Sequence, residues 1–573
     1  MRVLLLCSSF NGLTQRIQRE LTQLGHTTSV ELAISPEIMI EAVQLFGPDI
    51  IICPFLKHRV PPEIWRHYKC LVVHPGIEGD RGPSSLDWAI TNDASEWGVT
   101  LVQAAEEMDA GDIWGTETFS LRQTTKASVY RREVTAAASR LVFKALESAS
   151  DRKFKPKPLN YTDPNVTGRL MRPIKQYDRK IDWQLDDTAT IVRKINAADS
   201  SPGVLSNIAG LDVYLYDAHP AVGLIGKPGQ LLAQSHGAVC RATVDGAVWI
   251  THLKDARVGI PQAIKLPAVQ VLGNLSQELP HIETDGPTSI DSGLREIDYQ
   301  ERDQIGYVYF RFYNGAMNAQ HCRRLRRALI QAKKRPTKAI VLMGGEEFWS
   351  NGIHLNCVEA AVNPADESWD NINAMDDLVE EVLTTDKQIT IAALRTNAGA
   401  GGAVLAAACD HVAMREGVVL NAHYRTMGLY GSEYWTYILP KRVGEKNAQR
   451  LTEGCLPLIA GEALEIGLAD CVLSEDWTLY HEQLQTLCRR LVGASEWRRR
   501  INGKNKQRAQ DEKSKPLQHY RDAELKEMRR IFYDPQSEYH TARRNFVHKI
   551  AADSTPLRIA MHRGKGQRQT NAA

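Results

Sequence analysis

The N-terminal part of the chain alternates between short runs of apolar residues and stretches in which apolar residues recur with helical spacing. Residues 14–25 (TQRIQRELTQLG) show the helical spacing, and the apolar runs predict buried strands. These strands lie at residues 2–9, 27–34, 48–55 and 69–76. The alternation predicts a doubly wound, parallel α/β sheet over residues 1–155. The apolar run within residues 1–14 is too short to span a membrane and lacks a small-residue cleavage site, so we expect a buried first strand there and not a signal peptide.

The central part of the chain has a different pattern. Residues 151–167 (DRKFKPKPLNYTDPNVT) are rich in proline and charged residues and predict a linker, as do the polar residues 276–299. Between the linkers, a helix-like stretch at 188–198 precedes short β-like runs that are separated by glycine-containing turns. This pattern predicts a small β-barrel-like module over residues 168–275.

A second α/β region follows over residues 300–495. Its predicted elements are strands at 305–313 and 338–345, an amphipathic helix at 320–334, and two apolar runs within 388–414 that are joined by a glycine-rich turn. Residues 496–560 are rich in lysine and arginine and show helical spacing, which predicts a helical extension. We expect residues 561–573 to be disordered. The fold class is therefore multidomain α/β.

The composition of the chain limits which cellular compartment and which kinds of partner we expect for it. The chain has 573 residues, 43% of them hydrophobic, which indicates three or four domains. Lys+Arg (70) and Asp+Glu (68) nearly balance, which disfavours nucleic acid as a partner. The ten cysteines form no CxxC pair and several lie in apolar segments, so we expect reduced thiols in the cytoplasm. No run of about twenty apolar residues predicts a membrane span.

A histidine, His74, ends the predicted strand at 69–76 and is followed directly by Pro-Gly and an Asp-Arg-Gly turn. Ligands of doubly wound sheets gather at the carboxyl ends of strands. Asp109 lies in a later turn, DAGD, and a neighbouring carboxylate stabilises a protonated imidazole that works as an acid or base. A structural histidine and an ordinary turn would explain the same residues.

The order of these pieces resembles the folate-dependent formyltransferases, which include methionyl-tRNA formyltransferase. The matching motifs are His-Pro-Gly at 74–76, Arg81-Gly82, GVT at 98–100, Asp109-Ala-Gly-Asp-Ile, IDW at 181–183 and IVRKINAADSSPG at 191–203, so the resemblance covers residues 1–275. It implies that His74 and Asp109 act on the formyl group of N10-formyltetrahydrofolate, and that Arg81, Gly82 and Met108 contact the folate.

The chain departs from this family at Val72, where the formyltransferases have an asparagine two residues before the histidine. Loss of one such donor weakens stabilisation of a tetrahedral oxyanion by roughly 10²–10³ in rate. The departure therefore argues against an ordinary amine as the formyl acceptor.

Two glycine-bearing turns follow strands in the second α/β region, in MGGEEFWSNGIHLN (343–356) and in RTNAGAGGAVLAAACD (395–410). Glycine lets the backbone approach a ligand closely, and a helix N-terminus presents free N–H groups. Two such turns can direct two amides at one carbonyl oxygen, which is an oxyanion hole. Taken singly, each turn is explained equally well by a nucleotide site or by packing.

The pair of turns, in this order and spacing, resembles the crotonase (enoyl-CoA hydratase/isomerase) family over residues 300–490. The resemblance implies that the N–H groups of Ile353 and Gly401 form the oxyanion hole. It further implies coenzyme A contacts at Ser350, Gly352, His354, Leu355 and Gly402. The two glutamates of hydratases align with Val404 and Tyr424, so we do not expect hydratase chemistry.

The segment HYRTMGLYGSEYWTY (423–437) adds candidates for proton transfer. Tyr424 occupies a catalytic position of the family, and Glu433 is the nearest carboxylate in sequence, so we predict that these two residues handle a proton. Packing in an aromatic cluster explains the other tyrosines of the segment.

A formyl-folate site and an acyl-CoA site in one chain suggest formyl-CoA as a shared intermediate. The fused arrangement is similar to a family of [NiFe]-hydrogenase maturation factors. This resemblance implies release of carbon monoxide for the hydrogenase iron, with hydrogenase maturation proteins or the large-subunit precursor as partners, and no metal site is predicted.

Two alternatives stay open. One is a formyltransferase acting on an amine of tRNA or of a sugar nucleotide, with an inactive crotonase-like half as a platform, and the basic C-terminal region favours it. The other is a non-catalytic scaffold that docks on hydrogenase subunits, against which the retained His74 and Asp109 argue.

Overall fold

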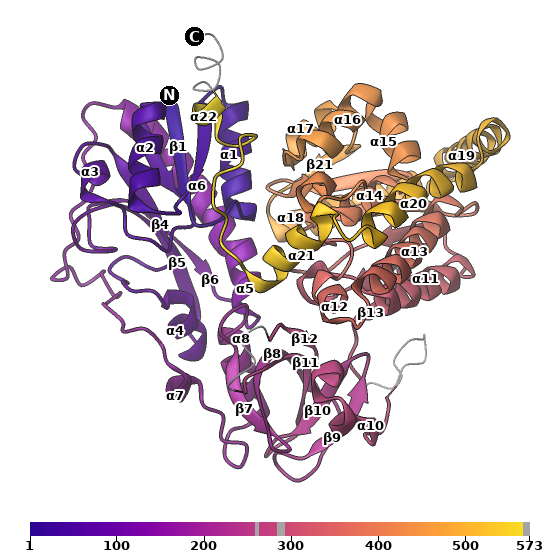
Figure 1. Ribbon diagram of the computed structural model, residues 1–573, viewed down its shortest axis with the longest axis horizontal. Coiled ribbons are helices and arrows are strands. Elements are labelled where there is room, and N and C mark those ends of the chain that lie inside the picture. Colours follow the sequence, from indigo (N-terminus) through magenta and orange to yellow (C-terminus); the bar gives the residue numbers. More distant parts are fainter. Residues whose placement is uncertain (258–262, 283–292, 565–573) are drawn as a thin grey trace. The chain divides into compact units, whose positions relative to one another are not determined.

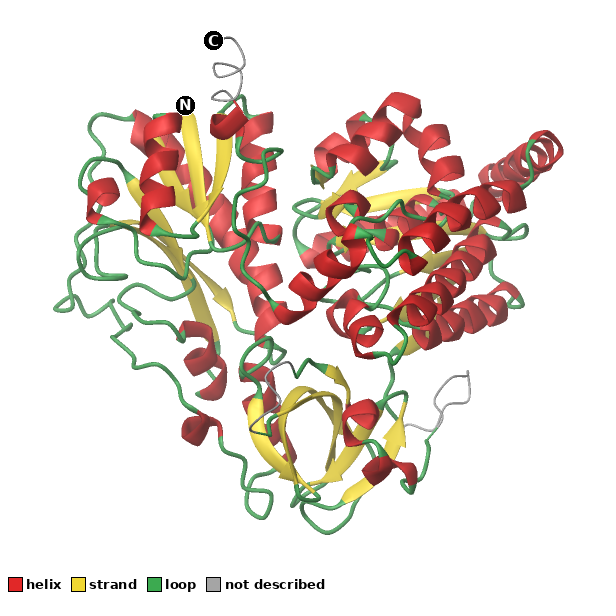
Figure 2. Ribbon diagram, viewed as in Figure 1, coloured by secondary structure: helices red, strands yellow, loops and turns green. Residues whose placement is uncertain are grey.

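The computed structural model describes residues 1–257, 263–282 and 293–564. The chain forms two compact units, which are residues 1–263, 267–280 and 551–573 on the one hand, and residues 264–266 and 281–550 on the other. Figure 1 labels the helices and strands, and Figure 2 separates them by type. Among the described residues, no helix has both the length and the apolar character needed to cross a bilayer. All ten cysteines are free thiols, in agreement with the lack of CxxC motifs.

The N-terminal sheet is mixed, with the strand order β2-β1-β3-β4-β5-β6. The strands are β1 (Arg2–Cys7), β2 (Thr27–Leu32), β3 (Ile50–Cys53), β4 (Cys70–His74), β5 (Glu96–Gln103) and β6 (Ile113–Ser120). The first four are parallel, as predicted, but β5 and β6 run antiparallel to their neighbours. The turn at 104–112 between β5 and β6 is too short for a parallel crossover. This explains why β6 runs antiparallel to β5.

Helices flank this sheet. One of them begins after a residue that favours a helix start, and another ends at a residue that favours a helix end. The helices are α1 (Gly12–Gln23), α2 (Pro36–Phe46), α3 (Pro62–Trp65), α4 (Ser85–Thr91), α5 (Lys126–Val129) and α6 (Thr135–Ser150), with a π-helical turn (Tyr130–Val134) before α6. Asn11 caps α1 by accepting the Thr14 N–H, and Gly47 ends α2 in the left-handed region. The β1 residues Val3–Cys7 are fully buried, so the expected first strand is central to the core.

The end of the chain returns to this unit. Residues 561–564 form α22 (Met561–Gly564), so the predicted disorder at 561–573 does not hold for them, and residues 565–573 lie outside the described part. A buried polar contact holds α22 against the sheet: the His562 ring lies 2.7 Å from a carboxylate oxygen of Glu31 on β2, and both side chains are fully buried. Arg563 and Thr555 also donate to this carboxylate.

The module predicted at 168–275 is a single antiparallel sheet in the order β7-β8-β11-β10-β9, curved as the yellow strands of Figure 2 show. Its strands are β7 (Val204–Ile208), β8 (Leu211–Ala221), β9 (Leu231–Ser235), β10 (Ala238–Ala242) and β11 (Ala247–Asp255), with β12 (Leu266–Pro267) after them. Its helices are α7 (Gln176–Arg179), α8 (Thr188–Ala197), α9 (Ala268–Leu272) and α10 (Asn274–Gln277). Ile191 and Ile195 of α8 pack into the core of this sheet.

The second unit is built on a six-stranded sheet, β13-β14-β15-β16-β18-β21, with a small sheet β17-β19-β20 beside it. The strands are β13 (Ile297–Arg302), β14 (Ile305–Phe310), β15 (Ala339–Leu342), β16 (Ile389–Leu394), β17 (Ala398–Gly399), β18 (His411–Arg415), β19 (Val419–Asn421), β20 (Leu458–Ile459) and β21 (Cys471–Leu473). Only β13 is antiparallel within the larger sheet. The linker predicted at 276–299 is therefore shorter than expected, because β13 begins at Ile297 and pairs with β14.

Helices cover both faces of the larger sheet. They are α11 (Ala319–Lys333), α12 (Leu355–Ala360), α13 (Pro364–Leu383), α14 (Gly401–Ala407), α15 (Trp435–Val443), α16 (Glu445–Gly454), α17 (Ala460–Glu465), α18 (Trp477–Leu491), α19 (Ala494–Ser514), α20 (Leu517–Tyr533) and α21 (Glu538–His548), with short 3-10 turns η2 (Tyr313–Gly315) and η3 (Tyr424–Met427). Alternate strand residues feed two apolar cores, one shared with α11 and α13 and the other with α18. The basic region after residue 495 is helical, as predicted, and α20 packs on α13.

Candidate catalytic sites

The first site is built around His74, the last residue of β4. Its Nε2 atom lies 2.8 Å from Oδ2 of Asp80, and its Nδ1 atom lies 3.6 Å from Oδ1 of Asp109. His74 and Asp80 are each 5% exposed. The imidazole is thus held between two carboxylates, of which Asp109 was predicted and Asp80 was not.

Glycines permit this arrangement. A methyl group added at Gly76 would overlap both the His74 ring and the Asp80 carboxylate, and one at Gly111 would overlap the Gln103 carbonyl. Side chains larger than hydrogen therefore cannot occupy these two positions without moving the site.

The loop after His74 is joined to the loop before β6. The Gly82 N–H donates to Oδ2 of Asp109 at 3.3 Å, and Nε of Arg81 donates to the Met108 carbonyl at 3.2 Å. Asp109 has φ +56, in the left-handed region that aspartate tolerates better than most residues. The structure therefore brings together all five residues predicted for the folate site, with the Met108 side chain 52% exposed.

Val72 lies two residues before His74, on the same face of β4. Its side chain packs against an apolar cluster that includes residues of α2 and α3. The position that is an asparagine in formyltransferases thus contributes no hydrogen-bond donor here.

The second site begins at the turn around Ile353. Met317 forms an isolated parallel bridge with Ile353, in which the Met317 N–H donates to the Gly352 carbonyl and the His354 N–H donates to the Met317 carbonyl. In such a bridge the N–H of Ile353 itself points away from Met317. The side chain of Asn371 on α13 holds the turn, because it donates to the Met317 carbonyl at 3.0 Å and accepts the His354 N–H at 3.2 Å.

Gly401 begins α14, so its N–H has no carbonyl partner inside the helix. The Cα of Gly352 approaches closely, since a methyl group added there would lie 3.0 Å from the Gly401 nitrogen. The predicted oxyanion-hole residues Ile353 and Gly401 are therefore adjacent in space, on two turns that only small residues allow.

The predicted proton-handling pair is in contact. The Tyr424 hydroxyl donates to Oε2 of Glu433 at 2.7 Å, and both side chains are buried. The other carboxylate oxygen, Oε1, lies so close to Gly401 that a methyl group at Gly401 would overlap it. Val404 is fully buried in the core and offers no polar group.

Burial and charge shift both groups of this pair. Burial, with a further contribution from Asp376, raises the pKa of Glu433 to about 8. Burial and the Glu433 carboxylate raise the pKa of Tyr424 as well. A carboxylate with a raised pKa is a stronger base than an exposed one, so Glu433 is suited to take up a proton near neutral pH.

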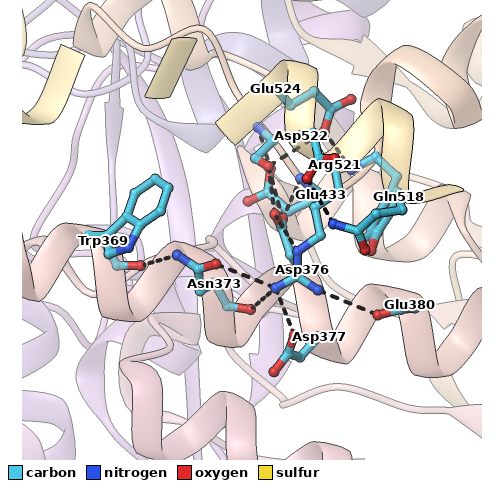
Figure 3. A network of polar contacts seen from close by, with 12 residues as sticks. Trp369, Asn373, Asp376, Asp377, Glu380, Glu433, Gln518, Arg521, Asp522 and Glu524 are labelled. Atoms are coloured by element: carbon cyan, nitrogen blue, oxygen red, sulfur yellow. Dashed lines mark hydrogen bonds and ion pairs between the residues drawn. The ribbon is translucent and has the colours of Figure 1, made fainter. Parts of the chain in front are cut away.

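The backbone at Glu433 is strained. Glu433 and Tyr434 have φ +62 and +60, and two consecutive left-handed residues other than glycine cost roughly 1–3 kcal/mol each. Asp376 on α13 accepts the Glu433 N–H, and Glu524 on α20 accepts the Tyr434 N–H. Figure 3 shows the side chains of Asp376 and Glu524 near Glu433. Burial raises the pKa of Asp376 to about 7 and that of Glu524 to about 8.

The residues predicted to contact coenzyme A line the first turn and the start of α14. The Ser350 hydroxyl accepts the Gly352 N–H at 3.2 Å, and the His354 ring accepts the Cys357 N–H at 3.2 Å as the cap of α12. Burial, with a contribution from His321, lowers the pKa of His354 to about 4. These side chains shape the turn, and the contacts of Ser350, Gly352, His354, Leu355 and Gly402 with coenzyme A stay a prediction.

Comparison with known proteins gives the family. Residues 305–553 match the family model described as enoyl-CoA hydratase/isomerase, and residues 173–261 match that of the formyl transferase C-terminal domain. The hydrogenase maturation factor HoxX of Bradyrhizobium diazoefficiens is 45% identical over 564 residues, which cover 98% of this chain and 97% of that protein. The chain belongs to the HoxX/HypX family of hydrogenase maturation factors.

The comparison with solved structures agrees with the comparison of sequences. A crystal structure of HypX from Aquifex aeolicus in complex with tetrahydrofolic acid superposes with a TM-score of 0.94 at 44% identity, covering 98% of this chain and 99% of that one. A methionyl-tRNA formyltransferase of Variovorax paradoxus is 29% identical over 39% of this chain and 65% of its own length. The predicted combination of a formyltransferase-type half with its β module and a crotonase-type half with a helical tail is thus confirmed as the HoxX/HypX architecture.

Three buried carboxylates at the two sites of this HoxX/HypX chain were not predicted from the sequence: Asp80, Asp376 and Glu524. Asp80 stands directly before the predicted folate contact Arg81. Asp376 and Glu524 interrupt the apolar stripes of α13 and α20, where Met375 and Val379, and Leu525 and Met528, are their buried neighbours. A charge on an apolar stripe was the signal that could have found them, because charged residues are rarely buried without a partner.

Proposed function

We propose that the chain transfers the formyl group of N10-formyltetrahydrofolate to coenzyme A and then releases carbon monoxide from formyl-CoA, as the source of the CO ligand in [NiFe]-hydrogenase maturation. Membership of the HoxX/HypX family supports the role in maturation. The tetrahydrofolic acid complex of the Aquifex relative supports a folate donor. The observation that carries the proposal is the Tyr424–Glu433 pair with Oε1 of Glu433 beside Gly401, since a buried carboxylate with a raised pKa lies next to a predicted oxyanion-hole residue.

At the first site, the coenzyme A sulfur attacks the formyl carbon of the donor. The bond from that carbon to N10 breaks, the thiol loses its proton and N10 gains one, so formyl-CoA and tetrahydrofolate leave. His74 carries this proton, and Asp80 fixes the direction of its ring. Asp109, 3.6 Å from the other ring nitrogen, stabilises the ring while it is charged.

At the second site, the formyl oxygen accepts hydrogen bonds from the N–H groups of Ile353 and Gly401. The Glu433 carboxylate removes the formyl proton, the carbon–sulfur bond breaks with its electron pair going to sulfur, and carbon monoxide leaves. The proton then passes to the thiolate, which regenerates coenzyme A without an oxidant or reductant. Tyr424 holds Oε2 of Glu433, so Oε1 is the oxygen that faces the substrate.

The direct test of the second step supplies synthetic formyl-CoA and measures carbon monoxide with a haem probe. We expect the wild-type protein to produce one carbon monoxide per coenzyme A released. Tyr424→Phe should slow this release, while formation of tetrahydrofolate from the formyl donor continues. Hydrolysis of formyl-CoA to formate without carbon monoxide would overturn the proposal.

A further inference from the structure

The segment that carries Glu433 is fixed by its own backbone N–H groups. The Glu433 N–H donates to Oδ1 of Asp376 at 2.8 Å, and the Ser432 hydroxyl lies 2.9 Å from both oxygens of that carboxylate. Asp376 belongs to α13, the helix that also holds the Ile353 turn through Asn371.

The residues after Glu433 are fixed by α20 of the C-terminal helical extension. The Tyr434 N–H donates to Oε2 of Glu524 at 2.9 Å, and the Thr436 N–H donates to Oε1 at 2.8 Å. The Thr436 hydroxyl donates to the same carboxylate. Glu524 is fully buried, so these three contacts are shielded from bulk solvent.

We infer that Asp376 and Glu524 are positioning residues, which hold the left-handed Glu433–Tyr434 pair so that Oε1 of Glu433 stays beside Gly401. The inference rests on the proposed function for the role of Glu433. It assigns the helical extension a direct part in the second site, because α20 supplies one of the two carboxylates.

The charges around the segment agree with this role. Arg521, on α20, lies 2.7 Å from Asp377, 3.4 Å from Glu380 and 3.9 Å from Asp376. Figure 3 shows Arg521 among these side chains. Arg521 therefore offsets part of the negative charge that these carboxylates of α13 carry. A carboxylate can accept hydrogen bonds from several N–H and O–H donors at once. It can therefore hold several groups of a strained turn in place.

Glu524→Gln tests the positioning directly. A glutamine turns its NH₂ group toward one of the two backbone N–H donors, so we expect the turn to shift and kcat for carbon monoxide release from formyl-CoA to fall about 10–100-fold. The KM for formyl-CoA and the rate of tetrahydrofolate formation should stay within about twofold. The matched control is Glu527→Gln on the same helix, whose partly exposed carboxylate pairs with Arg530, and it should leave both rates unchanged.

Asp376→Asn separates charge from hydrogen bonding, because asparagine can still accept the Glu433 N–H. We expect kcat at high pH to stay near the wild-type value, while the pH at which release is half-maximal moves down, since one negative charge beside Glu433 is gone. The titratable groups that face Glu433 are Tyr424 on η3, Asp376 on α13, Glu524 on α20 and Cys322 on α11.

The outcomes distinguish the two claims. A wild-type protein that makes no carbon monoxide from formyl-CoA sinks the proposed function. A wild-type protein that does, together with Glu524→Gln and Asp376→Asn proteins of unchanged kcat and pH profile, overturns the positioning role. If Glu524→Gln does not fold, Glu524→Asp decides, because it keeps the charge but shortens the reach to the Tyr434 and Thr436 N–H groups: a lower kcat is expected, and an unchanged kcat overturns the positioning role.

Discussion

The Nε2 atom of His74 lies 2.8 Å from a carboxylate oxygen of Asp80, six residues further along the chain. This contact fixes the imidazole in one orientation while its other nitrogen faces Asp109. The short loop between the two residues turns back on itself because Gly76 has no side chain to obstruct it.

We predict that Asp80→Asn slows formyl transfer. The asparagine still fits, but it cannot stabilise a charged imidazole, so the rate of tetrahydrofolate formation should fall about 10²-fold or more. Carbon monoxide release from supplied formyl-CoA should be unaffected. Asp93→Asn, an exposed carboxylate of the same unit, is the control, and an Asp80→Asn protein as fast as the control would contradict the role of Asp80.

Gly401→Ala should strongly slow carbon monoxide release while formyl transfer continues. The added methyl group overlaps Oε1 of Glu433 and displaces the base or the predicted oxyanion donor, for which we expect a loss of about 10²–10³ in rate. Gly503→Ala on the exposed face of α19 meets no atom within 4 Å and serves as the control. Full activity of Gly401→Ala would mean that this turn is not the site.

The rate of carbon monoxide release should rise with pH. Glu433 must be ionised to act as a base, and its pKa is raised to about 8, so the active fraction grows about tenfold per pH unit below that value and levels off above it. Asp376 and Glu524 titrate nearby, so the profile reports the group of carboxylates as a whole. Initial rates with formyl-CoA between pH 5.5 and 9 measure this, and a flat profile would exclude Glu433 as the base.

The C-terminal segment should stabilise the first unit. Burial alone would raise the pKa of Glu31, but hydrogen bonds from His562, Arg563 and Thr555 outweigh it and lower that pKa. His562→Ala should reduce the free energy of unfolding by about 1–3 kcal/mol at pH 7.

The pH dependence of this effect has a definite sign. Because the folded pKa of Glu31 is lowered, the stabilisation is present above its unfolded pKa and is lost as the pH falls through the folded value. Thermal unfolding of the His562→Ala protein, compared with the exposed control Asp553→Ala, should differ most near neutral pH. Equal melting temperatures at pH 7 would show that α22 contributes nothing.

Much of this architecture could be predicted from residue patterns. Glycine turns and the order of motifs indicated both halves. The crotonase resemblance indicated Tyr424, Glu433 was the nearest carboxylate in sequence, and the two side chains are in contact at 2.7 Å. Strand direction in β5 and β6 was not predicted, because an apolar run has the same pattern in parallel and antiparallel strands.

Two of the residues that were not predicted, Glu524 and Glu31, meet their partners only through long-range packing. Glu524 lies 91 positions after Glu433, and Glu31 lies 531 positions before His562, so only the packing of α20 and α22 brings each pair together. Local spacing carries no information about such contacts. The interrupted apolar stripe of α20 indicates that Glu524 is buried, but not which donors it meets.

The most direct measurement uses ¹³C-formyl-tetrahydrofolate and coenzyme A with the purified full-length protein, and follows labelled carbon monoxide on a haem probe. We expect labelled carbon monoxide from the wild-type protein, none from His74→Ala, and recovery of carbon monoxide from His74→Ala when formyl-CoA is supplied. Labelled carbon monoxide from His74→Ala at the full wild-type rate, or none from the wild-type protein when both substrates are present, would contradict a formyl-CoA intermediate made and consumed by this one chain.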